Sequence, residues 1–273
     1  MDSYEEKYNR LHAMMKGYAQ QNVAVAFSGG VDSSLLLKMA VTYAKEQGTI
    51  VYGITADTEL HPAGDRKIAG KVAKEAGAEH ILLKLKELKQ ADILQNPVDR
   101  CYRCKKYLFG EMKEKAQRLG AAILMEGTNA DDLRVYRPGI RAVEELGIKS
   151  PLKEAGLTKT EVRKLASRYG ISVADRPSAP CLATRFPYGE TLAPLKLKHV
   201  EQGEAFLRAL GLYNVRLRVH GEIARIEVDE DYMAGLLEKK REVAAYLKEL
   251  GYSYITLDLE GFRSGSMDIG IRN

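Results

Sequence analysis

One short stretch near the start of the chain limits the possible folds more than any other. Five consecutive apolar residues, 23–27, are followed by Ser28-Gly29-Gly30 and then by a second apolar segment. An apolar run that ends at glycine is typical of a strand buried on both faces, and the residues after it predict a helix start. We expect Asp32, Ser33 or Ser34 to cap that helix. A strand, a tight glycine turn and a helix N-terminus together favour an anion, because free backbone N–H groups and the helix dipole converge there.

The loop differs from two common nucleotide-binding motifs. It lacks the Gly-Lys-Ser/Thr ending of a Walker loop and the G-x-G-x-x-G spacing of a dinucleotide site. The sequence SGGVDS instead resembles the PP-loop of the ATP pyrophosphatase family, whose members bind ATP there and release pyrophosphate. A plain strand-to-helix turn is the alternative. The resemblance implies that ATP binds at Ser28, Gly29, Gly30, Val31, Asp32 and Ser33.

The pattern of apolar segments predicts an α/β fold. Strands are expected at 23–27, 49–55, 81–83 and 121–125, with helices between them and a further helix over residues 3–20. Such alternation predicts a doubly wound parallel sheet, which the resemblance identifies with the HUP-like PP-loop fold. Ligands bind beyond the carboxyl ends of such strands. We therefore expect Asp57 and Gly127, which follow two of the strands, to join the ATP site.

The pattern changes in the last third of the chain. A helix over 194–210, strands at 215–220 and 223–228, a helix over 230–250 and a strand at 254–259 predict a small α+β domain.

We place the domains at residues 1–185, for ATP, and 186–273, for substrate binding and oligomerisation. Arg216 and Arg218 alternate with apolar residues, so both leave one face of a strand. The two side chains could bind a phosphate in a bidentate manner, or they could lie on a solvated face of the sheet.

Composition excludes several classes of protein. The chain has 273 residues and a net charge of +5, without a long Lys/Arg run, so nucleic acid is an unlikely partner. No run of about 18 apolar residues exists to span a membrane. The polar, acidic start of the sequence argues against a secretory signal. We therefore expect a cytoplasmic protein.

Nearly the whole chain resembles the LarE family of PP-loop sulfurtransferases. The motifs that carry the resemblance are 28–33, 126–132, Tyr136-Arg137-Pro138-Gly139, 177–185, Arg216 with Arg218, and 261–265. The resemblance implies a substrate, pyridinium-3,5-biscarboxylic acid mononucleotide, whose carboxylates become thiocarboxylates for the nickel-pincer nucleotide. It also implies homo-oligomers.

The same resemblance assigns roles to particular residues. It places a sulfur-bearing cysteine at Cys181, substrate-phosphate arginines at Arg216, Arg218 and Arg263, and an acidic residue near the sulfur centre at Glu204. By itself, Glu204 reads as a helix-surface charge. Adenylation would turn a carboxylate oxygen into a leaving group, with Asp32 and Mg²⁺ organising the triphosphate. A role for Asp32 as a helix cap alone is the equal alternative.

The cysteines set this chain apart from the simplest members of the family, in which a lone cysteine is consumed. Cys101 and Cys104 form a C-x-x-C at the start of a predicted helix that runs through Leu119, and Cys181 is remote. Three thiolates can hold three corners of a [4Fe–4S] cluster, whose open iron could bind sulfide. The alternatives are sacrificial Cys181, a zinc site, for which a fourth ligand is missing, and a redox pair.

Other functions remain open at this point. A tRNA-thiolating PP-loop enzyme with a cluster would have a similar set of cysteines, and an ATP sensor would need none. An amide-forming synthetase would need an ammonia source, and the sequence has no glutaminase-like segment.

Overall fold

The computed structural model describes residues 2–134, 138–177, 180–263 and 265–268. The chain forms two compact units. The first unit contains Met1–Ala91 and Asp99–Ala179, and the second contains Asp92–Val98 and Pro180–Asn273. The predicted boundary after residue 185 differs from this division, since it would leave residues 92–98 in the first domain. The chain thus enters the second unit twice.

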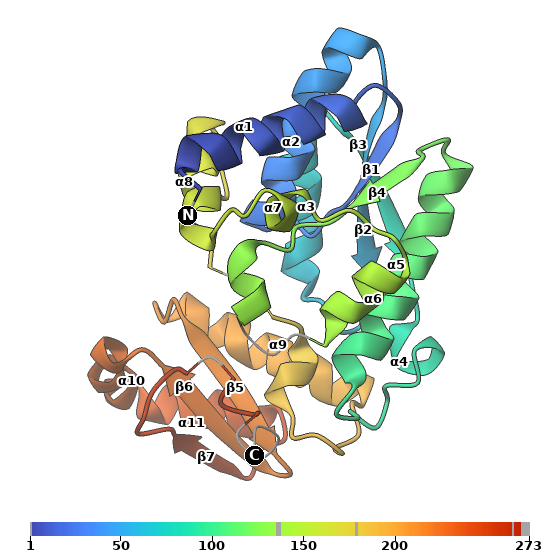
Figure 1. Ribbon diagram of the computed structural model, residues 1–273. Helices are drawn as coiled ribbons and strands as arrows, with labels where there is room; N and C mark the ends of the chain where they lie inside the picture. Colours follow the sequence, from blue (N-terminus) through green and yellow to red (C-terminus); the bar gives the residue numbers. More distant parts are fainter. Residues whose placement is uncertain (1, 135–137, 178–179, 264, 269–273) are drawn as a thin grey trace. The chain divides into compact units, whose positions relative to one another are not determined.

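A parallel four-stranded sheet forms the centre of the first unit (Figure 1). Its strand order is β3-β2-β1-β4, and each neighbouring pair is parallel. The strands are β1 (Val23–Ala26), β2 (Val51–Asp57), β3 (Glu79–Lys84) and β4 (Ile123–Met125). The predicted parallel, doubly wound sheet is therefore confirmed, with β1 in the interior of the sheet as its apolar run requires.

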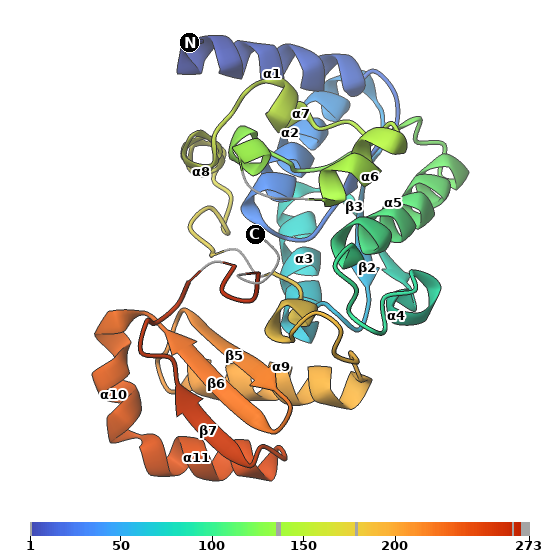
Figure 2. The ribbon, with the colours of Figure 1, turned by 60° about the horizontal axis from the view of Figure 1, so that its bottom comes forward.

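Helices cover both faces of this sheet. The helices of the unit are α1 (Tyr4–Tyr18), α2 (Val31–Gln47), α3 (Ala63–Ala76), α4 (Glu87–Gln90), α5 (Arg100–Arg118), η1 (Ala130–Arg134), α6 (Gly139–Glu145), α7 (Pro151–Glu154) and α8 (Lys159–Arg168). Alternate residues of β1 point to opposite sides: Val23 and Val25 pack with α1, α2, α3 and α8, whereas Ala24 packs with α5 and α6. In Figure 2 the strands lie between α3 and α5.

The helix ends follow local rules that the sequence displays. Helices α2 and α3 end at Gly48 and Gly77, both in the left-handed conformation that glycine adopts without strain. Helix α8 begins with a capping box, in which Thr158 and Glu161 bond each other's backbone. These predicted ends are confirmed.

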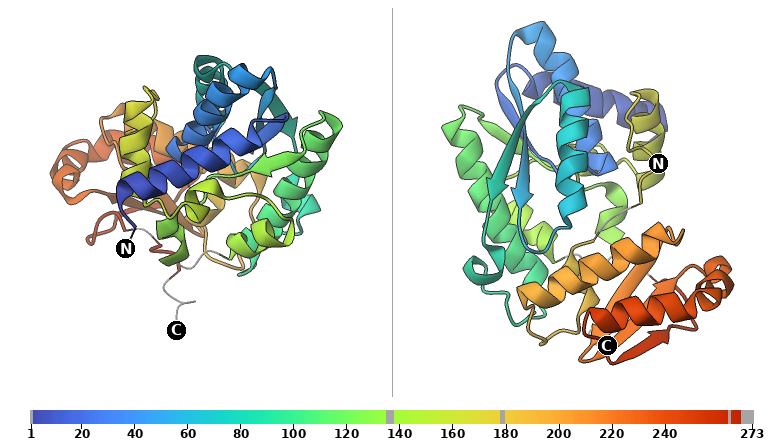
Figure 3. Two further views of the ribbon diagram at one scale, coloured as in Figure 1. Left: turned by 45° about the horizontal axis from the view of Figure 1, so that its top comes forward. Right: turned by 180° about the vertical axis from the view of Figure 1, so that it is seen from behind.

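The second unit is a three-stranded sheet covered by helices. Strand β5 (Val215–His220) is antiparallel to β6 (Ile223–Val228), and β7 (Tyr254–Leu257) is parallel to β6. Helices α9 (Pro194–Ala209) and α11 (Lys240–Glu249) cross the same face of the sheet (Figure 3), where Phe206 stacks on Tyr246. The remaining elements are η2 (Leu182–Arg185), η3 (Glu230–Tyr232) and α10 (Met233–Glu238).

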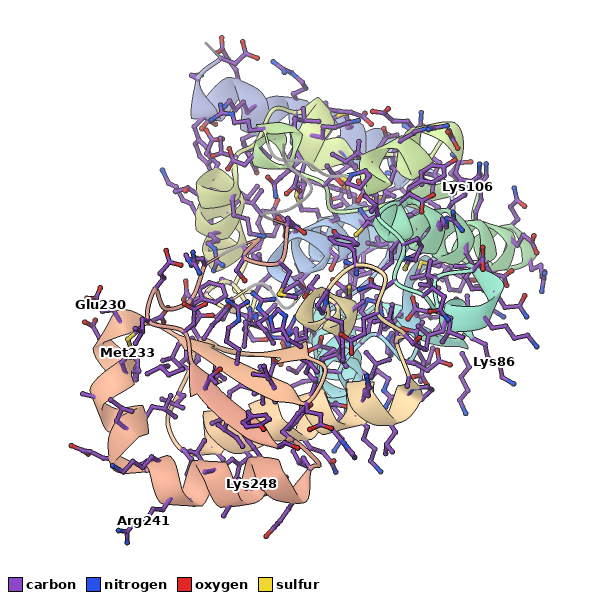
Figure 4. The ribbon with its side chains drawn as sticks, turned by 90° about the horizontal axis from the view of Figure 1, so that it is seen from below. Lys86, Lys106, Glu230, Met233, Arg241 and Lys248 are labelled. Atoms are coloured by element: carbon purple, nitrogen blue, oxygen red, sulfur yellow. The ribbon has the colours of Figure 1, made fainter. Side chains whose placement is uncertain are left out.

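The predicted single helix over 230–250 is wrong. It is divided into η3, α10 and α11, because Lys239 has φ −91° and ψ +10°, outside the α-helical range. Helix α11 buries Val243 and Leu247, and Arg241 extends away from its ribbon (Figure 4).

No helix in the described part of the chain combines the length and the apolar content that crossing a membrane requires.

Candidate functional site

The glycine loop between β1 and α2 is held by its own hydrogen bonds. The Ser33 hydroxyl donates to the Gly30 carbonyl at 3.2 Å, and the Gly30 N–H donates to the Ser28 hydroxyl at 3.3 Å. Gly29 has φ +71°, and a Cβ on it would lie 2.9 Å from the Ala69 Cα of α3. Only glycine fits there, so the loop backbone is fixed by both conformation and packing.

The predicted cap of α2 is wrong. The N-cap residue is Gly30, and among the described residues no side-chain hydrogen bond caps the helix. Ser33 bonds the carbonyl of Gly30 instead. The start of α2 thus keeps the free N–H groups that an anion site needs.

Asp32 lies in the first turn of α2 and is held by two partners from distant segments. Asn129 Nδ2 donates to it at 3.2 Å, and Lys159 Nζ forms an ion pair with it. Lys159 stands at the start of α8, where its backbone N–H also donates to Asp131 at 2.8 Å. An aspartate, a lysine and the free amides of α2 therefore share this end of the sheet.

Gly127 follows β4 and lies against the start of α2. A Cβ on Gly127 would be 2.9 Å from Asp32 Cβ and 3.0 Å from the Ser33 nitrogen. Asp57, the last residue of β2, forms an ion pair with Arg66 of α3. The predicted ATP-binding residues thus lie at the carboxyl ends of β1, β2 and β4, in the loops that follow them, or in the first turn of α2.

Sequence reasoning missed three residues of this site. Lys159 and Asn129 contact Asp32, and Arg176 pairs with Asp65 while one of its N–H groups lies 3.5 Å from the Gly29 carbonyl oxygen. Asn129 lies within the 126–132 motif, and Lys159 is the first residue of a helix that begins with a capping box. These two sequence features could have drawn attention to Asn129 and Lys159, but neither feature indicates a contact with Asp32 or the glycine loop.

Cys101 and Cys104 lie one turn apart at the start of α5, as predicted, and both are half-buried. The Cys104 thiol donates to Glu87 Oε2 at 3.2 Å, and Glu87, which is fully buried, also accepts from the Leu60 N–H at 3.1 Å. Arg100 is buried, with one guanidinium nitrogen 3.9 Å from the Cys101 sulfur. The two thiols are thus held in a polar environment beside a cation and a carboxylate.

Cys181 belongs to the second unit and directly precedes η2. Its carbonyl oxygen accepts from Arg185 Nη1 at 3.2 Å and from the Thr184 hydroxyl at 2.8 Å. Arg185 is itself held by Glu204 through two bonds of 2.8 and 3.0 Å. Glu204 therefore reaches the backbone of Cys181 through one buried arginine.

Glu204 is not a surface charge, contrary to the simplest interpretation of its sequence. It is 2% exposed, and it also accepts from the Leu217 N–H at 3.1 Å. Burial by itself would raise the pKa of Glu204, but the charge and hydrogen bonds of Arg185, the Leu217 N–H and the charge of Arg208 together outweigh burial and lower it. The carboxylate is thus kept ionised inside the unit.

The two arginines of β5 are also buried, so the solvated sheet face is excluded. Arg218 bonds Glu227 at 2.9 Å and the Thr184 carbonyl at 2.9 Å. Burial, together with repulsion from Arg185 and Arg218, lowers the pKa of Arg216 to about 10. Its guanidinium lies 5.1 Å from the centre of the Phe262 ring.

Arg263 is engaged with acidic partners, Asp258 at 3.2 Å and Glu260 at 2.7 Å. Cations crowded around Arg216 favour an anionic ligand.

Within the described residues, no three His, Cys, Asp or Glu side chains are grouped as a metal site. The first unit supplies two thiols one helical turn apart and the second supplies one. Thiolate ligands suit iron–sulfur clusters, so the donor chemistry of these thiols fits such a group. The motif residues Tyr136, Arg137 and Ser178 lie outside the described part of the chain.

Comparison with known proteins identifies the family. A family model described as the PP-loop domain matches residues 3–134. The chain is 38% identical over 248 residues to pyridinium-3,5-bisthiocarboxylic acid mononucleotide synthase of Lactiplantibacillus plantarum, covering 91% of this chain and 89% of that protein. It is 36% identical over 246 residues to an uncharacterized protein of Synechocystis, covering 89% and 91%.

A more distant similarity links the chain to RNA-modifying enzymes. It is 29% identical over 229 residues to the tRNA-specific 2-thiouridylase MnmA of Rickettsia massiliae, covering 69% of this chain and 61% of that protein. The two similarities at higher identity extend over both units, whereas the PP-loop model matches within the first part of the chain. The chain therefore belongs to the LarE family of PP-loop, ATP-dependent sulfurtransferases.

Proposed function

We propose that this enzyme adenylates the carboxylates of pyridinium-3,5-biscarboxylic acid mononucleotide and converts them to thiocarboxylates for nickel-pincer nucleotide synthesis. The similarity to the Lactiplantibacillus synthase supports the substrate. The observation that carries the proposal is the buried Glu204–Arg185 pair, which bonds the Cys181 carbonyl in the same unit as Arg216 and Arg218. A candidate sulfur carrier and candidate phosphate-binding cations thus share one unit.

The first step is activation of the carboxylate. A carboxylate oxygen of the substrate attacks the α-phosphorus of ATP, and pyrophosphate leaves, so the acyl carbon now carries AMP as a good leaving group. The amides of the glycine loop and the start of α2 hold the departing pyrophosphate. Lys159 supplies a positive charge there.

Asp32 offers the kind of oxygen ligand that Mg²⁺ prefers and would hold the ion against the triphosphate. When bound, Mg²⁺ neutralises developing charge on the phosphates.

The second unit holds the substrate by its phosphate. We assign this role to Arg216, Arg218 and Arg263. Arg216 has the strongest support, because it is buried beside other cations and its pKa is lowered. An anionic phosphate would relieve that repulsion, and guanidinium groups bind phosphate in a bidentate manner.

Sulfur reaches the activated carboxyl at Cys181. We propose that Cys101, Cys104 and Cys181 hold a [4Fe–4S] cluster. When bound, such a cluster leaves one iron without a protein ligand, where a sulfide from solution or from a sulfur donor can be carried. The residues of this chain keep the thiols in place: Arg185 holds the backbone of Cys181, and Glu87 accepts from Cys104.

The sacrificial alternative is that Cys181 itself attacks the acyl-adenylate and its Cβ–S bond breaks, leaving dehydroalanine. One assay separates the two chemistries. ATP, the biscarboxylate nucleotide and sulfide are supplied anaerobically to the wild type and to the Cys101→Ala and Cys104→Ala variants, and iron is counted. Many thiocarboxylates per chain in the wild type only, with iron bound, support the cluster. One thiocarboxylate per chain, with the protein lighter by one H₂S, refutes it.

Thiolation of tRNA is the second candidate, favoured by the similarity to MnmA. RNA binding depends steeply on salt because counterions are released, so a filter-binding titration distinguishes it. We expect no salt-dependent RNA binding. We also propose that the enzyme acts in the cytoplasm and that it is a homo-oligomer. Sedimentation of the purified protein tests the oligomeric state.

A further inference from the structure

Thr55 of β2 and His80 of β3 form a chain of hydrogen bonds that ends at the residue before the glycine loop. The Thr55 hydroxyl lies 2.6 Å from the Phe27 carbonyl oxygen and 2.9 Å from His80 Nε2. Thr55 and Phe27 are both buried, so the bond between them is shielded from water. Because Phe27 directly precedes Ser28, its carbonyl lies at the point where the chain leaves β1 and enters the loop.

The chemistry of the groups fixes which atom donates in each bond. A carbonyl oxygen only accepts, so the single hydrogen of the Thr55 hydroxyl is directed toward Phe27. The same hydroxyl oxygen must then accept from His80, whose Nε2 therefore carries a hydrogen. Burial lowers the pKa of His80 from its ordinary 6.5, so the ring is uncharged at neutral pH and is the Nε2–H tautomer.

The His80 ring also packs against α3, the helix that supports the glycine loop. A Cβ on Gly70 of α3 would lie 3.7 Å from His80 Nδ1, which is ordinary van der Waals contact. The neighbouring residue, Ala69, is the one that leaves no room for a Cβ on Gly29. The Phe27 ring meets the His80 ring edge to face, with the ring centres 6.1 Å apart. His80 thus contacts α3, which supports the loop, and Phe27, which leads into it.

We propose that His80 is a positioning residue for ATP, which holds the Thr55 hydroxyl on the Phe27 carbonyl and so keeps the glycine loop in the conformation that accepts the phosphates. The inference rests on the proposed function only for the binding of ATP at that loop. The apparent dissociation constant rises as the fraction of protein in the binding conformation falls. Loss of the hydrogen-bond chain should therefore change the affinity for ATP and not only the stability of the fold.

ATP binding to the full-length protein, measured by calorimetry without the carboxylate substrate, sulfide or iron, tests the proposal. His80→Leu removes the donor, and His80→Gln supplies an amide N–H in its place. We expect the dissociation constant for ATP to rise at least about threefold in His80→Leu, within the range of one neutral hydrogen bond, and to stay within about twofold of wild type in His80→Gln. Rescue by a donor distinguishes positioning by the N–H group from simple filling of space.

Thr55→Val removes the middle of the chain and keeps the shape of the side chain, and Thr49→Val is its matched control. The Thr49 hydroxyl also donates to a backbone carbonyl, that of Ala19 at 2.7 Å, but Thr49 precedes the amino end of β2, whereas Thr55 lies near the carboxyl end. Both variants should lower stability, but only Thr55→Val should weaken ATP binding, by at least about threefold. Because His80 acts through Thr55, the double variant with His80→Leu should bind ATP no more weakly than Thr55→Val alone.

Unchanged ATP affinity in His80→Leu and Thr55→Val would overturn the proposal, and so would a loss that His80→Gln does not restore. A double variant whose loss is the product of the two single losses would also overturn it. Should these variants not fold, NMR of the wild-type His80 ring decides: a hydrogen on Nε2 supports the chain, and a neutral ring with its hydrogen on Nδ1 overturns it. Wild-type protein that binds ATP but forms no thiocarboxylate would refute the proposed function and leave the role of His80 standing.

Discussion

Replacing Glu204 with alanine should destabilise the second unit by about 3–5 kcal/mol, the usual cost of removing one partner from a buried ion pair. The structure supports a value in this range. Glu204 and Arg185 are each 2% exposed, so the substitution leaves the guanidinium buried without its carboxylate. It also deprives the Leu217 N–H of the acceptor that it has at 3.1 Å.

The chain contains no tryptophan. A Phe206→Trp reporter, placed in every variant on the helix that carries Glu204, therefore follows this unit selectively in urea. Arg208→Ala is the control: Arg208 also bonds Glu204, at 3.3 Å, but is 40% exposed, so it should cost at most about 1 kcal/mol. A decrease of less than about 1 kcal/mol in the free energy of unfolding for Glu204→Ala would refute the reasoning, because an unpaired buried charge destabilises the folded state by more than that.

The pH dependence of the same variant gives an independent check. The folded-state pKa of Glu204 is lowered from its ordinary 4.5, because Arg185, the Leu217 N–H and Arg208 together outweigh the opposing effect of burial. The stabilisation is therefore present above pH 4.5 and is lost as the pH falls through the folded-state pKa. The difference between wild type and Glu204→Ala should be constant from neutral pH down to that region and shrink below it. A difference that grows on acidification would contradict the assigned ion pair.

Three further predictions concern the binding sites. Gly29→Ala should weaken ATP binding at least about tenfold in calorimetry, because the left-handed backbone strain of about 1–2 kcal/mol adds to a clash with α3. The control is Gly48→Ala, which is also left-handed but would have nothing within 4 Å of its Cβ, so it should lower stability and leave ATP affinity unchanged. Equal ATP affinities for the two variants would contradict this. Lys159→Gln should slow substrate-dependent pyrophosphate release by about 10²-fold, the typical cost of one preorganised electrostatic contact, and an unchanged rate would remove Lys159 from the ATP site. Arg216→Ala should raise the KM for the phosphate-bearing substrate without changing ATP affinity, and replacement of the exposed Arg241 by alanine is the control. Binding of the substrate to the wild type should weaken as the pH rises through about 10, where Arg216 loses its proton. Binding that does not change with pH across that range would exclude Arg216 from the phosphate site.

Much of the first unit could be predicted because its signals are local. The apolar run of β1, the glycines that end α2 and α3, and the capping box of α8 each act over a few residues. Ligands bind at the carboxyl ends of the strands in parallel sheets, and this rule predicted that Asp57 and Gly127 lie at the same edge as the glycine loop.

The missed or wrong features depend on tertiary contacts. Lys159 meets Asp32 across 127 positions of sequence, and no local pattern encodes such a pairing. Glu204 resembles any exposed acid on a helix until Arg185, 19 positions away, is folded against it. The cap of α2 was wrong for another reason: a loop that binds anions keeps its amides free, whereas capping preferences describe helices that satisfy them.

The central claim is that ATP is cleaved to activate a carboxyl group for sulfur delivered at Cys181. Its most direct measurement is the count of pyrophosphate and thiocarboxylate formed per chain by anaerobic protein given ATP, the pyridinium biscarboxylate nucleotide and sulfide, with Cys181→Ser alongside. The account predicts one pyrophosphate for each thiocarboxylate, many of both per wild-type chain, and no thiocarboxylate from the variant. Thiocarboxylate formed without pyrophosphate, or formed equally well by Cys181→Ser, would contradict it.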